Sequence, residues 1–448
     1  MDHLKTHTQR RRVFALAWPV IAENFLETSL GIVDTILVAG LGVGAIAGVG
    51  TAIQVLFFIM AVLSALSVGS AVLVAQAFGA GRLERASDLA RQSLLWSIVF
   101  SVPLALIGLF LSGPIVSLFG LEPAVANIAE GYLKITTCTA VVMTARFLIG
   151  GVFRGVGDSR TPMLVTAGAN VINVGLSYIL IYGHLGAPAL GAEGSAWGTL
   201  VARAMALSVL ILLLWRGRHG VSLKGTTPLR LDGAIARQVL KIGIPAAMEQ
   251  ILITCGFSLL TILVAHLGTP TLGAHRIAMN AMSVSFMPGF GFSMAATALV
   301  GQSIGRKKPD EGRIIARIAT LWGVLWMGGI GLVILLTAPY VMRIFTQDQQ
   351  VIDVGAAGLQ IVAIAQPFWA IIFIQSGAIR GTGNTSFPLR INATSIWLSV
   401  GLAYLFTYWF GETLAVIWTA FMFTAPLASL FLIWKFRKII HKAIGEAQ

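Results

Sequence analysis

The sequence predicts an all-α integral membrane protein in which twelve transmembrane helices form two six-helix lobes. Three observations support this fold class: the composition, a succession of long apolar spans, and an internal repeat. Of the 448 residues, 56% are hydrophobic and only 11% are charged. About 25% charged residues is typical of soluble domains, so the composition excludes an ordinary soluble protein.

A sequence repeat divides the chain into two copies of one module. Residues 35–42 read TILVAGLG, and residues 261–268 read TILVAHLG, 226 positions later. The same offset continues without a gap through further matched residues: Pro19 and Pro245, Glu23 and Glu249, Gln76 and Gln302, Arg154 and Arg380, Pro162 and Pro388. One register kept over about 160 residues indicates a duplicated structural unit.

Each copy contains six apolar spans. A helix rises about 1.5 Å per residue, so roughly 20 apolar residues cross a bilayer core of about 30 Å. In the first copy we expect spans near residues 13–41, within the charge-free stretch 35–81, and near 92–119, 127–153, 161–183 and 194–215. In the second copy we expect them near residues 240–266, 272–303, 314–337, 353–379, 387–409 and 413–434. The domains are then an N-terminal lobe (1–215), a cytoplasmic linker (216–237) and a C-terminal lobe (238–448).

The basic residues predict the orientation in the membrane. The formal net charge is +13, but Lys and Arg lie mostly in alternate connections between spans. This pattern orients membrane proteins, and we expect no nucleic-acid partner. It places both termini and the linker in the cytoplasm, for a multi-pass protein of the inner (cytoplasmic) membrane. Six spans is an even number, so both copies insert the same way up, as a parallel repeat with a pseudo-twofold axis along the membrane normal.

Two smaller features complete this description. The first apolar run is too long and too acidic for a cleavable signal peptide. Cys138 and Cys255 both fall inside apolar spans, and we expect them to be small buried apolar residues.

The first span carries three carboxylates, Glu23, Glu27 and Asp34. At about 100° per residue, Glu27 lies roughly 40° round the helix from Glu23, and Asp34 only roughly 20°. A charge at mid-membrane costs at least about 2.5 kcal/mol, so we expect this face to line a wet cavity. Asp34 is the strongest functional candidate, and Glu249 is the repeat mate of Glu23.

Other polar residues inside spans are weaker candidates. Asn173 and Ser177 lie four apart on one helical face, and Thr199 follows early in the sixth span. Such residues are usually interhelical hydrogen bonds, but near an acid they become neutral oxygen ligands for a cation or a proton site. Arg203 and Arg146 are candidate counter-ions, although Arg146 is expected to extend towards the membrane surface.

Two further motifs have both a structural and a functional interpretation. Met282, Phe286 and Met287 form either ordinary packing or a soft wall for varied apolar ligands. RGVGD (154–158) and RGTGN (380–384) are expected to be cytoplasmic turns, in which glycine adopts positive φ and arginine meets lipid headgroups. No phosphate loop, HExxH or GxSxG motif is present, so we expect neither an enzyme nor a bound cofactor.

Several motifs together resemble the multidrug and toxic compound extrusion (MATE) family, over the whole chain: GIVDTILVAGLG, RGVGDSRTP, RGTGNTSFP, GAHRIAMN and FMPGFGFSMAATALVGQ. The resemblance implies two lobes around a central cleft that opens alternately to either membrane face. It implies a cation site at Asp34, Asn173, Ser177 and Thr199, and a functional role for Glu249. Many members have an acid or asparagine in place of Ser177, and an acid of the tenth span of some sodium-coupled members falls at Trp369 here.

We therefore expect a cation-coupled (H⁺ or Na⁺) multidrug efflux antiporter, acting as a monomer, that exports amphipathic, cationic organic compounds by alternating access. The residues expected to contact substrate are Glu249, Glu27, Glu23, Met282, Phe286 and Met287. Protons are the expected main coupling ion, because one carboxylate is enough to carry a proton. Sodium at Asp34, Asn173 and Thr199 is the alternative, with a single acid to compensate the lost water of the ion.

Two other functions remain open at this point. A lipid-linked saccharide flippase of the same superfamily would need several basic residues in its cleft, and the spans offer Arg203, Arg146 and Lys134. An integral-membrane enzyme would need a His/Asp or Cys constellation at one membrane face, and the sequence contains none.

Overall fold

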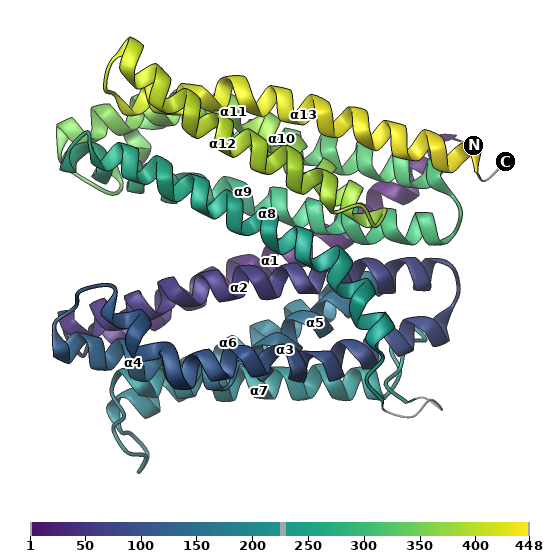
Figure 1. The fold of residues 1–448 in the computed structure, drawn as a ribbon, viewed down its shortest axis with the longest axis horizontal. Coiled ribbons are helices and arrows are strands. Elements are labelled where there is room, and N and C mark those ends of the chain that lie inside the picture. Colours follow the sequence, from purple (N-terminus) through teal and green to yellow (C-terminus); the bar gives the residue numbers. More distant parts are fainter. Residues whose placement is uncertain (1, 225–229, 447–448) are drawn as a thin grey trace. The chain divides into compact units, whose positions relative to one another are not determined.

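The computed structural model describes the backbone of residues 2–224 and 230–446, and within these ranges all side chains except those of residues 2–6, 57, 58, 61, 62 and 64–66. Thirteen α-helices form in this part of the chain (Figure 1). The first sequence copy contains α1 (Asp2–Ala39), α2 (Val43–Gly79), α3 (Leu83–Ser117), α4 (Pro123–Cys138), α5 (Ala140–Val156), α6 (Arg160–Tyr182) and α7 (Ala192–Trp215). The second contains α8 (Gly233–Ala265), α9 (Thr269–Gly305), α10 (Pro309–Arg343), α11 (Gln349–Gly381), α12 (Ser386–Phe410) and α13 (Leu414–Gly445).

The predicted span near 127–153 is not one helix. It is broken at Thr139 into α4 and α5, whose axes are bent by 53°. The hydroxyls of Thr136, Thr137 and Thr139 each donate to a backbone carbonyl four residues earlier, at 2.9, 2.6 and 2.7 Å. Such bonds compete with the main-chain ladder and bend helices. Counting the bent pair as one span gives six per copy, as predicted.

The helix boundaries follow the sequence repeat. α2 and α9 begin 226 residues apart and end 226 residues apart, and so do α3 and α10. The starts of α4 and α11, and those of α6 and α12, keep the same offset. The duplicated sequence therefore forms a duplicated structure, and the prediction of two six-helix lobes is confirmed.

Most of these helices are suited to a bilayer. Among the described residues, nine helices are long and apolar enough to cross a membrane, or ten with the α4–α5 pair. Large apolar side chains are also exposed on the surface of these helices, as a lipid environment allows. Examples are Phe110, Leu325 and Leu336, which are 68%, 61% and 72% exposed. α1, whose apolar part carries Glu23, Glu27 and Asp34, is not among the nine, and α2 contributes two shorter apolar stretches, Val43–Leu56 and Ser67–Gly79.

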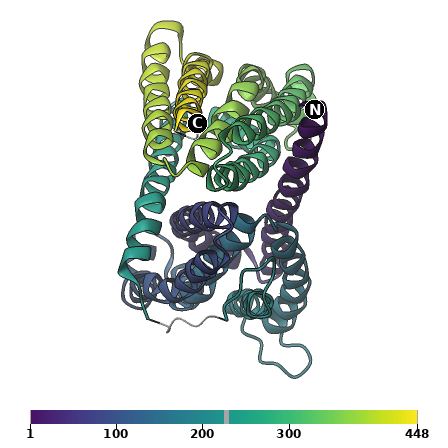
Figure 2. The same cartoon turned by 90° about the vertical axis from the view of Figure 1, so that its right-hand side faces the viewer.

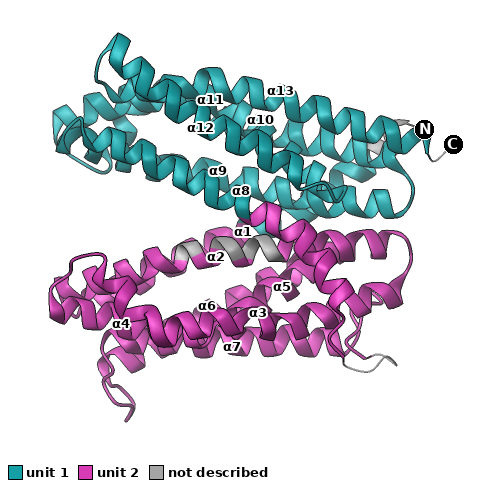
Figure 3. Cartoon of the chain, in the orientation of Figure 1, with its two compact units in different colours: residues 1–21, 248–448 teal, residues 22–247 magenta. Residues whose placement is uncertain are grey.

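The helices gather into two compact units (Figure 3). Unit 1 contains residues 1–21 and 248–448, and unit 2 contains residues 22–247. The first part of α1 therefore packs in unit 1, where Val13, Leu16 and Ala17 join the hydrophobic core. The first part of α8 packs in unit 2, and its Ile235 and Val239 contact the core there. The two units therefore do not coincide with the two sequence copies, because the first part of the first helix of each copy packs in the other unit.

In unit 1, α11 is the central helix and packs against α9, α10 and α13. In Figure 2 the helices of this unit are seen close to end-on, gathered in a bundle. In unit 2, α5 packs against α2 and α3, while α6 and α7 pack against each other.

The predicted linker is partly a structural element of unit 2. Val221 and Leu223 are buried in its core, and the backbone N–H of Ser222 donates to the Ser87 hydroxyl at 3.0 Å. Residues 225–229 of the predicted linker lie outside the described residues.

The expectation that both cysteines are buried is wrong. Cys138 is exposed and Cys255 is partly exposed. In a membrane span the outer face meets lipid, so an apolar residue there need not be buried to avoid water.

Candidate functional site

Asp34 of α1 and three polar side chains from α6 and α7 form one cluster in unit 2. Asn173 of α6 donates from Nδ2 to Oγ1 of Thr199 on α7 at 2.8 Å, and Ser177 donates to Asn173 Oδ1 at 3.4 Å. The Thr199 side chain is a neighbour of the Asp34 carboxyl. All four residues are at most 8% exposed. The structure thus brings together the four residues predicted as the cation site.

The Asp34 carboxylate is incompletely satisfied. Its Oδ1 atom is buried and has no hydrogen-bond partner among the described residues. An unpaired buried acceptor costs about 1–3 kcal/mol, and more when it is charged. An added proton or a bound cation would remove this cost, so the site is chemically suited to either.

A cation at this site would be held by one carboxylate and neutral oxygens, those of Thr199 and Asn173. Among the described residues, no three His, Cys, Asp or Glu side chains gather in a way that could hold a metal ion. The donor set is poor in charge for a sodium ion and sufficient for a proton.

The other carboxylates of α1 are paired with arginines of α5. Glu27 forms an ion pair with Arg146, whose side chain is only 15% exposed. Glu23 lies 3.5 Å from Nη1 of Arg154 and accepts a 3.4 Å hydrogen bond from Thr166. The expectation that Arg146 extends to the membrane surface is wrong, because the partly buried carboxylate of Glu27 offers it a partner within the protein.

The second copy repeats one of these pairs. Glu249 of α8 accepts from Nη2 of Arg380 at 2.9 Å and from Nδ2 of Asn392 at 2.6 Å. Glu249 and Arg380 are the repeat mates of Glu23 and Arg154. The same ion pair thus joins the first helix of each copy to the RG motif.

The interpretation of both RG motifs as turns with headgroup-facing arginines is wrong. α5 continues to Val156 and α11 to Gly381, so both arginines lie inside helices, and Arg154 is only 8% exposed. The second glycine of each motif does end a helix, with φ of 92° at Gly157 and 90° at Gly383. The first glycine allows close helix packing, because a Cβ at Gly155 would lie 2.7 Å from the Ala71 carbonyl oxygen.

The predicted apolar substrate residues belong to an aromatic cluster of unit 1. Phe286 and Trp369 lie edge to face with ring centroids 5.2 Å apart, and Trp369 contacts Phe421 in the same way at 5.2 Å. Met282 is fully buried in this core, while Phe286 and Met287 are partly exposed. Trp369 is thus a packing residue in this chain.

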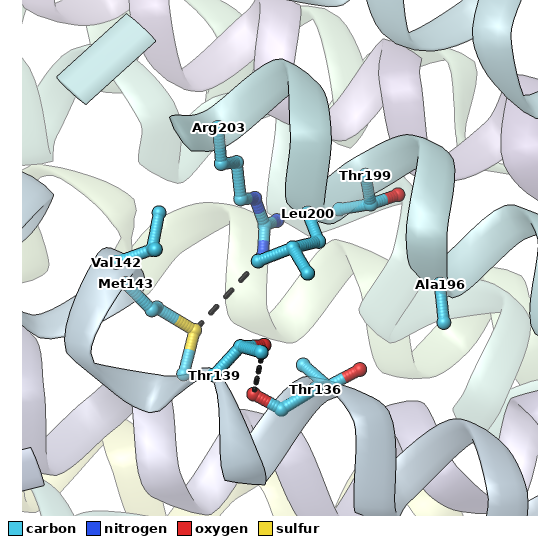
Figure 4. Close-up of a pocket in the computed structure, with 8 residues that line it drawn as sticks. All are labelled: Thr136, Thr139, Val142, Met143, Ala196, Thr199, Leu200 and Arg203. Atoms are coloured by element: carbon cyan, nitrogen blue, oxygen red, sulfur yellow. Dashed lines mark hydrogen bonds between the residues drawn. The ribbon is translucent and has the colours of Figure 1, made fainter. Parts of the chain in front are cut away.

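The sequence analysis missed a pocket beside the Asp34 site. Thr136, Thr139, Val142, Met143, Ala196, Thr199, Leu200 and Arg203 line it (Figure 4). Thr199 is shared with the Asp34 site, and Arg203 is an electrostatic neighbour of both Asp34 and Glu27. The sequence signal for the pocket was an arginine in mid-span together with the TTCT run that breaks the fourth span.

Comparison with known proteins gives a consistent result. The MatE family model matches residues 19–179 and again residues 245–405, the two copies of the repeat. A protein of Thermotoga maritima named as a probable multidrug resistance protein NorM is 30% identical over 440 residues, covering 96% of this chain and 94% of that protein. A protein of the same name from Mannheimia succiniciproducens is 27% identical, covering 97% of this chain and 96% of its own.

Solved structures share the fold. The outward-facing structure of a multidrug resistance MATE family transporter matches with a TM-score of 0.88 at 21% identity, over 97% of this chain and 96% of that one. A MOP superfamily transporter from Pyrococcus furiosus, described as having a binding pocket of reverse polarity, matches with a TM-score of 0.87 at 21% identity, over 97% of this chain and 96% of that one.

Proposed function

The chain belongs to the MatE family of membrane transporters, and from this premise we propose that it is a cation-coupled antiporter. Inward movement of a cation through the site at Asp34 drives outward movement of amphipathic organic compounds by alternating access. The transporter acts as a monomer in the inner membrane, with both termini in the cytoplasm.

One observation carries the assignment of the coupling site. Glu23, Glu27, Asp34 and Glu249 lie in the apolar part of the first helix of either copy, and the three glutamates each have an arginine partner. Asp34 forms no ion pair among the described residues, and one of its oxygens is buried without a partner. A carboxylate without a fixed partner can exchange a cation during a transport cycle, whereas one held by a guanidinium is already compensated.

We propose protons as the main coupling ion and sodium as the alternative. The site offers one carboxylate, and the guanidinium of Arg203 lies within electrostatic range of it. This positive charge opposes a bound proton and a bound sodium ion alike. The preference for protons rests on the ligands, because a sodium ion must give up its hydration for one carboxylate and a few neutral oxygens.

The substrates are organic cations and related amphiphiles. Phe286, Met282 and Met287 supply soft and aromatic surface, and aromatic faces attract cations. Glu23, Glu27 and Glu249 remain predicted substrate residues, but since each is paired with an arginine, they contribute through the surrounding charge rather than as free carboxylates.

The flippase alternative has less support. Of the three basic residues that could line its cleft, Arg146 is neutralised by Glu27 and Lys134 is exposed on the surface of α4. Only Arg203 remains, and a chain of phosphates and sugars would call for several such residues.

The test is export of ethidium, an amphipathic cation, from reconstituted vesicles under an imposed pH gradient or an imposed sodium gradient. We expect the pH gradient to drive transport in the wild type and not in Asp34→Asn. The variant should stay folded, because it removes an incompletely satisfied buried charge without changing shape.

Asp353→Asn, the same change at an exposed position on α11, is the matched control and should transport normally. Wild-type export by Asp34→Asn at equal protein level would exclude Asp34 from coupling. Export driven by sodium alone, with no response to pH, would exclude the proton.

A further inference from the structure

The pocket beside Asp34 contains a guanidinium that forms no ion pair with any described residue. Arg203 lies near the middle of α7, and its guanidinium points into the pocket towards Met143 (Figure 4). Its one hydrogen-bond contact with a described residue is from Nη1 to the Met143 Sδ atom, at 3.9 Å. A guanidinium has five N–H donors, and a thioether is a weak acceptor. Most of the donor capacity of Arg203 is therefore unused.

The rest of the pocket does not supply the missing acceptor charge. Thr136 and Thr139 donate their hydroxyl hydrogens to backbone carbonyls, and the remaining lining is mainly apolar. α5 begins at Ala140, next to the pocket wall formed by Thr139 and Val142.

Only the first copy has the residues that build this pocket. The repeat mates of Thr136, Thr139 and Arg203 are Val362, Ala365 and Ser429. α11 runs without a break through the first two, and Ser429 is buried and donates to the Pro426 carbonyl. The helix break, the pocket and the arginine thus occur together in one copy. This supports a binding site rather than an incidental gap in helix packing.

Among the described residues of unit 2, Arg203 differs from the other two arginines of this region, because it forms no ion pair. α1 contributes Glu23, Glu27 and Asp34 to this region, and α5 and α7 contribute three arginines. Arg154 and Arg146 are each paired with a glutamate. Arg203 and Asp34 form no such pair, although they interact electrostatically. An intramembrane charge without a partner is costly and marks a ligand pathway by default.

We propose that this pocket binds a small anionic group, the carboxylate of a zwitterionic amphiphile. The inference rests on the proposed function. It specifies that the substrates include organic cations that also carry a carboxylate. The fork of a guanidinium matches a carboxylate with two parallel hydrogen bonds. The cavity volume is about 20 Å³, little more than the roughly 10–15 Å³ that a single water needs, so the pocket can take a small head group and not a whole substrate.

The test uses octanoylcarnitine and octanoylcholine, which share a tail and a quaternary ammonium and differ by a carboxylate. Binding to the purified full-length protein in nanodiscs is measured by isothermal titration calorimetry. We expect Arg203→Met to weaken octanoylcarnitine binding by about tenfold or more and to leave octanoylcholine binding within about twofold. Arg203→Lys keeps the charge without the fork, and should lose less.

Lys134→Met is the matched control, because it removes a cation from the exposed face of the adjacent helix α4. It should bind both compounds like the wild type. Equal effects of Arg203→Met on the two compounds, or none on either, would overturn the proposal. A wild type that binds octanoylcholine as tightly as octanoylcarnitine would do the same.

A second measurement separates a substrate carboxylate from a small anion of the solution. Acetate at constant ionic strength should raise the unfolding temperature of the wild type and not of Arg203→Met, whereas its neutral isostere acetamide should raise neither. Acetate stabilisation without a preference for octanoylcarnitine would mean that the pocket takes free anions only, against the proposal.

These binding measurements need no gradient, so they are independent of coupling. If Arg203→Met lost octanoylcarnitine binding but the wild type showed no gradient-driven export, the proposed carboxylate pocket would stand and the proposed antiport function would fail. If the wild type exported ethidium under a gradient but Arg203→Met bound octanoylcarnitine as the wild type does, the antiport function would stand and the carboxylate pocket would fail.

Discussion

Glu249 is more deeply buried than Glu23, Glu27 or Asp34, the carboxylates of the first span. One of its oxygens accepts from both Arg380 and Asn392, and the residue is 4% exposed. Its repeat mate Glu23 lies farther from its arginine, at 3.5 Å against 2.9 Å. A buried ion pair contributes little net stability, but removing one partner is costly because a charge is left unpaired.

We therefore predict that Arg380→Met destabilises the protein by about 3–5 kcal/mol. Glu249→Gln should cost less, because the amide oxygen still accepts from both donors. The double variant should be more stable than Arg380→Met alone, since it leaves no buried charge behind. Unfolding of the detergent-solubilised protein by denaturant measures all three.

The equivalent changes in the first copy are the control for this prediction. Arg154→Met should cost less than Arg380→Met, and Glu23→Gln should impair ethidium export less than Glu249→Gln. A double variant no more stable than Arg380→Met would contradict the buried-pair argument. The opposite ranking in transport would contradict a larger role for Glu249.

At this scale the sequence predicted which residues meet but not how their charges are compensated. Periodicity and the resemblance were enough to group Asp34, Asn173, Ser177 and Thr199. The pairing of Glu23 with Arg154 has a sequence signal, since both recur 226 residues later as Glu249 and Arg380. It was missed because the glycines after each arginine predicted a turn, whereas the helices extend through the arginines.

At the scale of elements, the break between α4 and α5 was not predictable from hydropathy. The span 127–153 is continuously apolar enough to cross the membrane, and its copy forms the single helix α11. The difference lies in hydroxyl groups that bond to the backbone, at Thr136, Thr137 and Thr139. Hydropathy scales treat threonine as nearly neutral, so they do not register this competition for main-chain carbonyls.

The turn between α5 and α6 fixes the start of the linker. Asp158 in this turn accepts from the backbone N–H and hydroxyl of Thr161 at 3.0 and 2.7 Å. It also contacts Arg218 Nε and His219 Nε2, both at 3.1 Å. Its repeat mate Asn384 keeps the local role, accepting from the Phe387 N–H at 3.2 Å, and has no second partner among the described residues. An acid is therefore found in the copy where basic linker residues dock.

This contact predicts a pH dependence of stability. Burial alone would raise the pKa of Asp158, but hydrogen bonds from Thr161 and His219 outweigh it and hold the pKa below its usual range. With a folded-state pKa below the unfolded value of about 3.9, the stabilisation is complete above that value and is lost as pH falls through the folded pKa. Asp158→Asn should cost about 1–3 kcal/mol at pH 7, and the difference from wild type should shrink below about pH 4.

Denaturant unfolding of wild type and variant between pH 7 and pH 3 measures this difference. Asn384→Asp is the control, and it should give no stabilisation because no described cation contacts Asn384. A difference between wild type and Asp158→Asn that stayed constant over this pH range would show that charge is not the cause.

At the scale of the whole molecule, the duplicated architecture carries different chemistry in its two copies. The repeat mate of Asp34 is Leu260, which is 1% exposed in an apolar core, and that of Arg203 is Ser429. The first copy holds Asp34 and Arg203, which form no ion pair among the described residues, while the second holds the aromatic cluster around Trp369. The repeat predicted the shared framework, but only the residues where the copies differ point to a division of roles.

The repeat also leads to a prediction about orientation. The connection after α7 begins with Arg216, Arg218 and Lys224, whereas the connections at 183–191 and 411–413 contain no Lys or Arg. Basic connections stay in the cytoplasm, so the second and third should face outwards. Single cysteines at Pro188 and Glu412 should react in intact cells with a membrane-impermeant maleimide, and one at Lys224 should not.

The choice of positions and background follows from the structure. Pro188, Glu412 and Lys224 are all exposed, whereas Gly186 has a φ of 81° that a cysteine would strain. The exposed Cys138 and the partly exposed Cys255 must first be replaced by serine, because either could react on its own. Labelling of Lys224→Cys only after the membrane is permeabilised is the expected internal control. Its labelling in intact cells, with Pro188→Cys and Glu412→Cys protected, would reverse the orientation and place the coupling cation's entry on the opposite face.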